Sequence, residues 1–137
     1  IPIKSPYNRL LRAEIKLLWA MASIKLGHEV KAAWDVIQAY RLLAENQAEF
    51  PEFLPNLKSL GCLHILIGSV PENQKWIASV LGLRGSIQQG MKELELASKD
   101  KIWGREAQFC KTFIQAYVLN MDFNKKEDFN QLIQPFK

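Results

Sequence analysis

Apolar residues recur every three or four positions along most of the chain, which is the period of an amphipathic α-helix. Apolar and polar residues do not alternate over the length of a strand, and the hairpin dipeptides Asn-Gly and Asp-Gly do not occur. The pattern therefore predicts an all-α protein of six or seven helices joined by short loops. The expected helices span about residues 7–26, 29–48, 55–69, 72–81, 87–98 and 102–121, and a last apolar ridge in the tail, 124–137, contains Phe129, Leu132, Ile133 and Phe136.

The first two expected helices differ in how their apolar residues are distributed. Residues 7–26 carry one apolar stripe, so this helix is expected to pack through it with its basic residues facing away. Residues 29–48 are apolar on two sides, which predicts a helix packed between neighbours, as in a stacked array. The stripe consists of Leu11, Ile15, Leu18, Ala22 and Leu26, and the two faces of the second helix are Val30, Ala33, Trp34, Ile37 and Ala44, and Ala32, Val36, Ala39 and Leu43.

The stretch LGLRGSIQQG, residues 81–90, has the composition of a corner between two helices. Gly82 is placed for a left-handed helix cap, Gly85 supplies a bend, and Ser86 opens a capping-box pattern. Gly90 falls inside the following helix, where glycine costs stability, and therefore predicts the close approach of another backbone. A phosphate-binding loop needs a preceding strand and a lysine beside the serine, and a glycine loop that grips RNA needs a mixed α/β domain. Neither context is present.

Most aromatic residues are spaced as core residues on successive helices. The fourth expected helix, residues 72–81, is likewise expected to carry its apolar residues inward, namely Trp76, Ile77, Val80 and Leu81. The aromatic residues expected mainly to pack are Trp19, Trp34, Tyr40, Trp76, Trp103, Phe109, Phe113 and Tyr117.

Length and charge narrow the class of protein. The 137 residues fit a single domain, 1–137, with the apolar share of an ordinary soluble globular protein. The longest apolar run, Leu60–Val70, is too short to cross a bilayer and indicates a buried helix.

The net charge of +4 is diffuse, with its excess mainly on the first helix, so nucleic-acid binding is not expected. The chain shows no signal peptide and no initiator Met, so we expect a processed chain or a piece of a longer protein, and no compartment is assigned.

Residues that commonly carry catalysis or bind metals are few and scattered. His28 is expected to be exposed in a turn, and His64 to be a core or groove histidine with a satisfied ring nitrogen. Cys62 and His64 are two positions apart, on different sides of a helix, and no cysteine–histidine pair has the spacing of zinc ligands. Cys62 and Cys110 are expected to be buried thiols, with a disulfide between them left open. Glu14 is expected to form an ion pair within its helix or with a neighbouring one. The sequence therefore names no catalytic, cofactor-binding or metal-binding residue.

The segment Gly27–Leu43 resembles the second half of a tetratricopeptide repeat. Gly27, Ala32 and Ala39 keep the spacing of that repeat, and Val36 stands where a bulky residue normally packs. The preceding half departs from the repeat pattern at its other small and aromatic positions. The sequence therefore contains one degenerate repeat-like unit, at about residues 7–48.

A longer resemblance covers about residues 9–97. It is carried by Arg12-Ala13-Glu14, the corner at Pro71, the stretch 81–86 and Gly90. These features are similar to the diverged tetratricopeptide-like family that includes the fungal inclusion-body clearance protein. The resemblance implies a right-handed α–α superhelix, usually part of a longer array, without catalytic residues, and bacterial chains of this kind look like pieces of larger repeat proteins. Further helices are then expected over 55–122 and a tail over 124–137.

Helical-repeat proteins leave a concave face that binds peptides, and Trp, Tyr and Arg dominate the energetics of such contacts. Trp34, Tyr40 and Arg41 on the second helix are the candidates for that face. The expected function is a non-catalytic scaffold, without cofactor, that binds a protein, a peptide or another copy of itself. The alternative is a peripheral membrane module, in which the basic first helix meets anionic lipid and Leu60–Val70 lines a pocket.

Overall fold

The computed structural model describes residues 4–118, and every regular element in that range is helical. The all-α prediction is confirmed for these residues, and the expected helix ends lie within a few residues of the observed ones, except that the expected end of the last helix, at about residue 121, lies outside the described residues. A short 3-10 turn, Glu72–Gln74, precedes α4, and a π-helical turn, Ile114–Val118, continues α6. The apolar ridge expected in the tail lies outside the described residues. The helices are α1 (Pro6–Lys25), α2 (Glu29–Glu49), α3 (Pro55–Gly68), α4 (Lys75–Val80), α5 (Ile87–Ala97) and α6 (Gly104–Phe113).

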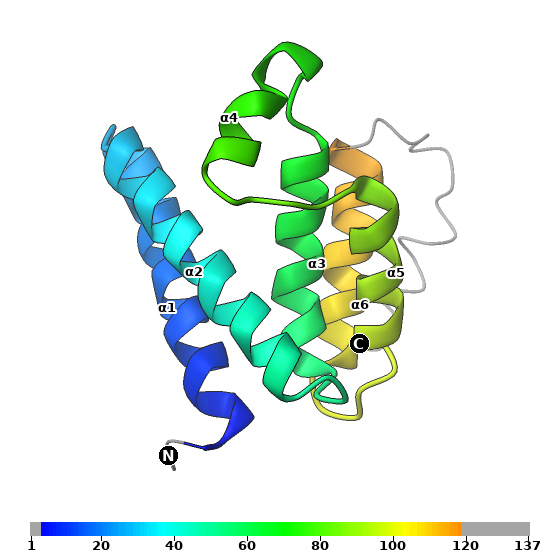
Figure 1. The fold of residues 1–137 in the computed structure, drawn as a ribbon. Helices are drawn as coiled ribbons and strands as arrows, with labels where there is room; N and C mark the ends of the chain where they lie inside the picture. Colours follow the sequence, from blue (N-terminus) through cyan, green and yellow to red (C-terminus); the bar gives the residue numbers. More distant parts are fainter. Residues whose placement is uncertain (1–3, 119–137) are drawn as a thin grey trace.

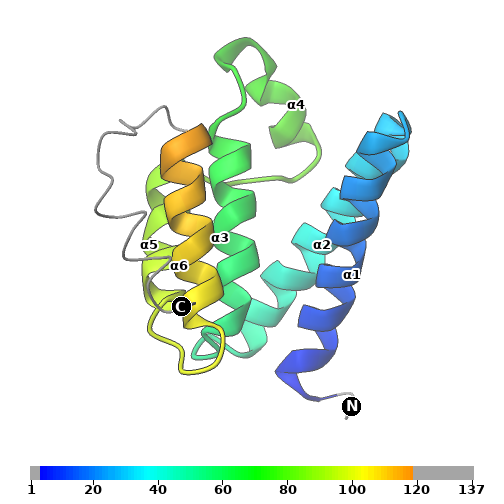
Figure 2. The same cartoon turned by 180° about the vertical axis from the view of Figure 1, so that it is seen from behind.

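The helices form two layers, which are seen from opposite sides in Figures 1 and 2. α1 pairs mainly with α2, α3 pairs mainly with α5, and α6 lies against both α5 and α3. α1, α3 and α6 run in the same direction, whereas α2 and α5 run in the opposite direction (Figure 1). α2 and α5 lie in front in Figure 1, and α1 and α6 lie in front in Figure 2, with the short α4 at one end. The side formed by α1, α3 and α6 is called the three-helix face below.

Local signals in the sequence set the ends of these helices. Gly27 and Gly82 have φ angles of 79° and 76°, the left-handed conformation expected just after a helix. The Ser86 hydroxyl accepts a hydrogen bond from the Gln89 N–H at 3.1 Å, so the predicted cap of α5 is confirmed. Pro55 occupies the first turn of α3, where its missing N–H costs nothing.

The close approach predicted by Gly90 is confirmed, and its partner is Gly61 on α3. A Cβ atom added at Gly90 would lie 2.4 Å from the Gly61 carbonyl oxygen, and one added at Gly61 would lie 2.9 Å from the Gly90 carbonyl oxygen. Facing glycines therefore let α3 and α5 pack backbone against backbone. The adjoining core combines Ile65 and Leu94, both fully buried.

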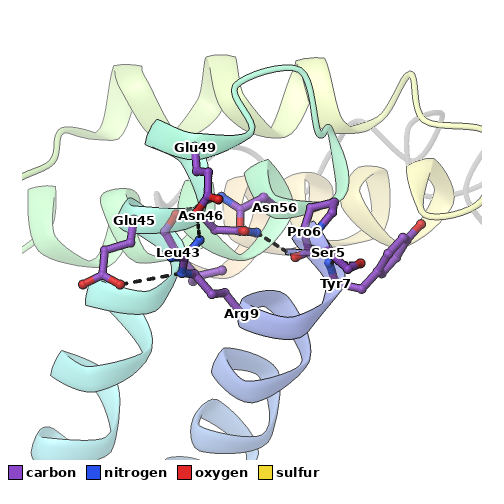
Figure 3. Close-up of polar contacts among 9 residues, drawn as sticks. All are labelled: Ser5, Pro6, Tyr7, Arg9, Leu43, Glu45, Asn46, Glu49 and Asn56. Atoms are coloured by element: carbon purple, nitrogen blue, oxygen red, sulfur yellow. Dashed lines mark hydrogen bonds and ion pairs between the residues drawn. The ribbon is translucent and has the colours of Figure 1, made fainter. Parts of the chain in front are cut away.

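Two buried asparagines join the α1–α2 hairpin to α3 (Figure 3). The Asn46 amide donates to the Pro6 carbonyl oxygen at 2.9 Å and to Asn56 Oδ1 at 3.0 Å. The Asn56 amide in turn donates to the Leu43 carbonyl oxygen at 3.0 Å. The two side chains thus connect the start of α1, the end of α2 and the start of α3. Beside them lies the main apolar cluster, which contains Leu10, Ala13, Ala39, Leu43, Leu60 and Leu63.

Three expectations about burial are wrong. The apolar stripe of α1 faces solvent, with Leu18 65% exposed, because α1 packs on α2 through smaller residues such as Ala13 and Ala20. Small side chains let the two helix axes approach closely, so the larger ones are displaced to the outer side. The apolar residues of α4 are exposed as well, because α4 projects from the end of the layers (Figure 1). Most of the aromatics expected to pack are also exposed, namely Trp19, Trp34, Trp76, Trp103, Phe109 and Phe113.

Candidate functional site

A charged cluster lies on the three-helix face near the first turns of α3 and α6, with one residue from each of the three helices. The Lys58 ammonium of α3 contacts Glu14 Oε2 of α1 at 3.4 Å and Glu106 Oε1 of α6 at 2.8 Å. The buried Ser59 hydroxyl also donates a hydrogen bond to Glu14. The ion pair predicted for Glu14 is therefore confirmed, and its partner belongs to a neighbouring helix.

Lys58 stays protonated in this cluster. Burial lowers its pKa, but the hydrogen bond to Glu106 and the charges of Glu14 and Glu106 raise it by more, so the pKa of Lys58 lies above its ordinary value. The cluster therefore places two acidic side chains around one ammonium. Its formal charge is negative although the whole chain carries +4.

A pocket of about 230 Å³ opens beside this cluster. The rings of Tyr7 and Trp103 and the aliphatic chains of Leu10 and Leu11 line it together with Pro55 and the three charged side chains. Aromatic faces and carboxylates are the groups that attract an organic cation. The pocket can therefore accept a positively charged side chain whose aliphatic part lies against the apolar wall.

A second pocket, of about 250 Å³, lies between α3 and α6 further along the same face. Its exposed apolar residues include Leu66 on α3 and Phe109 on α6. The rings of Phe109 and Phe113 are stacked with their centroids 6.3 Å apart. The lining is entirely apolar and consists of Cys62, Ile65, Leu66, Phe109, Cys110, Phe113 and Ile114.

Both cysteines are free thiols and half-buried, and they face each other across the α3–α6 contact. A hydrogen bond from Cys62 and then the Lys58 cation lower the pKa of Cys110, which is about 7 despite the opposing effect of burial. The hydrogen bond with Cys110, followed by burial, raises the pKa of Cys62. The two thiols therefore differ in how readily they ionise.

Trp34, Tyr40 and Arg41 do not form one surface. Trp34 and Arg41 are exposed on the outer side of α2, seven residues apart and hence two helical turns along the same side. The Tyr40 hydroxyl instead donates to the Arg84 carbonyl oxygen at 3.0 Å, and its ring makes an edge contact with His64 at 5.9 Å. All three belong to the layer opposite the three-helix face.

His64 has a structural environment, as expected. Its side chain is buried and its Nδ1 atom pairs with Glu93 of α5. A Cβ atom at Gly85 would lie 2.8 Å from the His64 ring, so the corner at residues 81–86 lies directly over it. His28 is exposed in the turn after α1, also as expected. Within residues 4–118, no group of three His, Cys, Asp or Glu side chains is arranged to hold a metal ion.

A shallow hollow of about 540 Å³ lies at the outer edge of the α1–α2 hairpin. Its apolar part is Ile15 and Trp19, and the Lys31 ammonium lies 5.7 Å from the centroid of the Trp19 ring. Arg12 and Lys16 add positive charge, and Asp35 pairs with Lys31 at 2.8 Å. The edge is therefore apolar and basic, in contrast to the acidic cluster on the three-helix face.

Sequence reasoning missed the three-helix face because its parts are far apart in the chain. Lys58 is 44 residues from Glu14 and 48 from Glu106. The one local signal is a repeated spacing of four, from Lys58 to Cys62 and from Glu106 to Cys110, which places each pair on one side of its helix. That spacing does not show that the two helices are neighbours.

The chain was compared with protein-family models, curated proteins and solved structures, and none of these matches it. None of the described helices is long and apolar enough to span a lipid bilayer.

Proposed function

We propose that this chain is a non-catalytic protein-interaction module of the tetratricopeptide-like helical-repeat type. We further propose that its three-helix face binds a peptide segment of a partner protein. The single observation that carries this proposal is the pair of pockets on α1, α3 and α6, one charged and aromatic and the other apolar. Neighbouring pockets of this kind suit the side chains of one extended or helical peptide.

The arrangement of the helices supports the repeat type. In helical-repeat arrays the first helix of each pair lines one surface and the second helix lines the other. Here α1 and α2 form one pair and α3 and α5 another, with α6 placed as the first helix of a third. The exposed edge of α1 is then the surface on which a neighbouring repeat or a second copy stacks.

The charges and the lining of the two pockets indicate which side chains the bound peptide carries. The carboxylates of Glu14 and Glu106 share the single ammonium of Lys58, so a second cation completes the charge balance. Tyr7 and Trp103 provide aromatic contacts for its stem. The ligand is therefore a segment with one Arg or Lys for this pocket and apolar side chains for the pocket between α3 and α6.

Site-specific photo-cross-linking of the protein in its native cells tests the proposal. Benzoylphenylalanine replaces Phe109 on the three-helix face, and the matched control carries it at Trp34, which is equally exposed on the opposite layer. We expect cross-links from position 109 to a single partner segment containing a basic residue and apolar neighbours. A synthetic peptide of that segment should then change the intrinsic tryptophan fluorescence, to which Trp103 contributes together with three other tryptophans.

Glu106→Gln tests whether the charged pocket contributes to binding of the peptide. We expect this change to weaken binding of the peptide about tenfold, the effect of losing one charge-assisted hydrogen bond worth about 1.5 kcal/mol. Cross-links from Trp34 with none from Phe109 would move the binding surface to α2. A cross-linked segment without a basic residue, or unchanged affinity in Glu106→Gln, would remove the proposed role of the charged pocket.

A second candidate function is membrane contact, which is favoured by the hollow at the outer edge of the α1–α2 hairpin. Trp19 is exposed there beside Arg12, Lys16 and Lys31, a combination that suits an anionic lipid surface. Flotation with phosphatidylcholine vesicles, with and without phosphatidylserine, separates the two functions. Recovery with the anionic vesicles that disappears at high salt supports membrane contact, because salt screens exposed charges. Absence of the chain from the floated fraction at low salt rejects it.

A further inference from the structure

The three-helix face also contains a pair of thiols with a defined geometry. α3 and α6 lie side by side and run in the same direction (Figure 2). Lys58 and Cys62 on α3 are four residues apart, as are Glu106 and Cys110 on α6, so their contacts form two successive levels one helical turn apart. Lys58 meets Glu106 at the first level, and Cys62 meets Cys110 at the second. The same register that pairs Lys58 with Glu106 places the two thiols against each other across the α3–α6 contact.

Both thiols are accessible, and the groups around them favour the thiolate of Cys110. Both cysteines are half-buried and line the apolar pocket between α3 and α6, so a small reagent can reach them. Three charged groups influence Cys110: the Lys58 cation favours its thiolate, and the carboxylates of Glu106 and Glu14 oppose it. The strongest contribution is the hydrogen bond donated by Cys62, and together these effects give Cys110 a pKa of about 7.

We propose that Cys110 and Cys62 form a thiol-modification site, in which Cys110 reacts with small-molecule disulfides and Cys62 resolves the adduct into an internal disulfide. The Cys110 thiolate attacks one sulfur of glutathione disulfide, and one glutathione thiolate leaves. Cys62 then loses its proton to solvent and its sulfur attacks that of Cys110, which releases the second glutathione thiolate. Two protein thiols are oxidised to one disulfide while glutathione disulfide is reduced to two thiols. The inference is independent of peptide binding at the same face.

Glutathione disulfide is the probe in the first test, with peptide mapping as the readout. We expect the intact chain to lose two hydrogen atoms, and tryptic peptide 59–75, containing Cys62, to be joined to peptide 106–111, containing Cys110. Disulfides only between separate chains, or a stable glutathione adduct on the unaltered protein without internal linkage, would overturn the proposal.

Two serine variants test the order of the steps. Cys62→Ser retains the attacking thiol and a hydroxyl that can still donate a hydrogen bond, so it should accumulate the mixed disulfide on Cys110. Cys110→Ser leaves the thiol with the raised pKa and should form little adduct under the same conditions. The reverse result would contradict the assignment of Cys110 as the attacking thiol. Circular dichroism before the reaction shows that both variants are folded.

Alkylation of the unaltered protein tests the site without any substitution. The rate of iodoacetamide modification at Cys110 should rise with pH through a midpoint near its pKa of about 7. Lys58→Gln removes the cation, so the midpoint should move to higher pH. A midpoint near 9, the ordinary value for cysteine, or faster modification of Cys62 than of Cys110, would overturn the proposal.

Discussion

Helices α1 and α3 are both rich in large apolar residues, but they use them in opposite ways. α3 is enclosed by α1, α2, α5 and α6, and nine of its residues are buried. α1 is longer, yet its four buried residues are Leu10, Ala13, Ala20 and Ser23, and most of its large side chains face solvent. The comparison shows that helix packing is governed by how closely backbones can approach as well as by hydrophobicity. Close approach of the backbones is permitted by the small residues on the contact side of α1 and by Gly61 on α3.

The largest effect is expected from truncating an enclosed leucine of α3. Leu63 is 3% exposed in the cluster between the hairpin and α3, so Leu63→Ala removes buried methyl groups and leaves a cavity. We expect the free energy of unfolding to fall by about 3 kcal/mol, as measured by urea denaturation. A loss smaller than about 1 kcal/mol would show that this cluster is loosely packed, and the contrast with α1 would fail.

Gly90→Ala tests the backbone contact between α3 and α5. In an unconstrained helix this change stabilises by about 1 kcal/mol. Here the added Cβ would lie 2.4 Å from the Gly61 carbonyl oxygen and 2.5 Å from Ile65 Cγ1, so we expect a net destabilisation of about 2 kcal/mol. Thermal unfolding followed by circular dichroism measures it, with Lys92→Ala on the exposed side of α5 as control. A stabilised Gly90→Ala variant would contradict the close approach.

Leu18→Ala is expected to have the smallest effect on stability. It is the same substitution as Leu63→Ala, made at an exposed position. Leu18 is 65% exposed on α1, so we expect the free energy of unfolding to change by less than about 0.5 kcal/mol. The same urea titration compares the two variants directly. A cost comparable with that of Leu63→Ala would mean that the outer side of α1 is covered in solution, for example by a second copy, and sedimentation at several concentrations would detect that copy.

The candidate site shows why its residues could not be predicted together. The sequence indicated that Glu14 needs an ion-pair partner and that His64 is a core residue, because each judgement depends on the neighbours along one helix. Selecting Trp34, Tyr40 and Arg41 relied on residue type and on a single helix. The structure places Tyr40 against the corner at residues 81–86 and turns it away from Trp34 and Arg41.

The sequence by itself determined the helices, most of their ends and one position where two backbones approach closely. Helical period, capping residues and glycine conformation act over a few neighbouring positions, so Gly82, Ser86 and Gly90 could be interpreted before any contact was known. Only the tertiary structure decided which side of α1 is covered and which helices are neighbours. A helical period fixes the angles between side chains on one helix, but the partner of each side depends on the packing of the whole chain. For that reason Glu14, Lys58 and Glu106, and likewise Cys62 and Cys110, come together only when α1, α3 and α6 lie side by side.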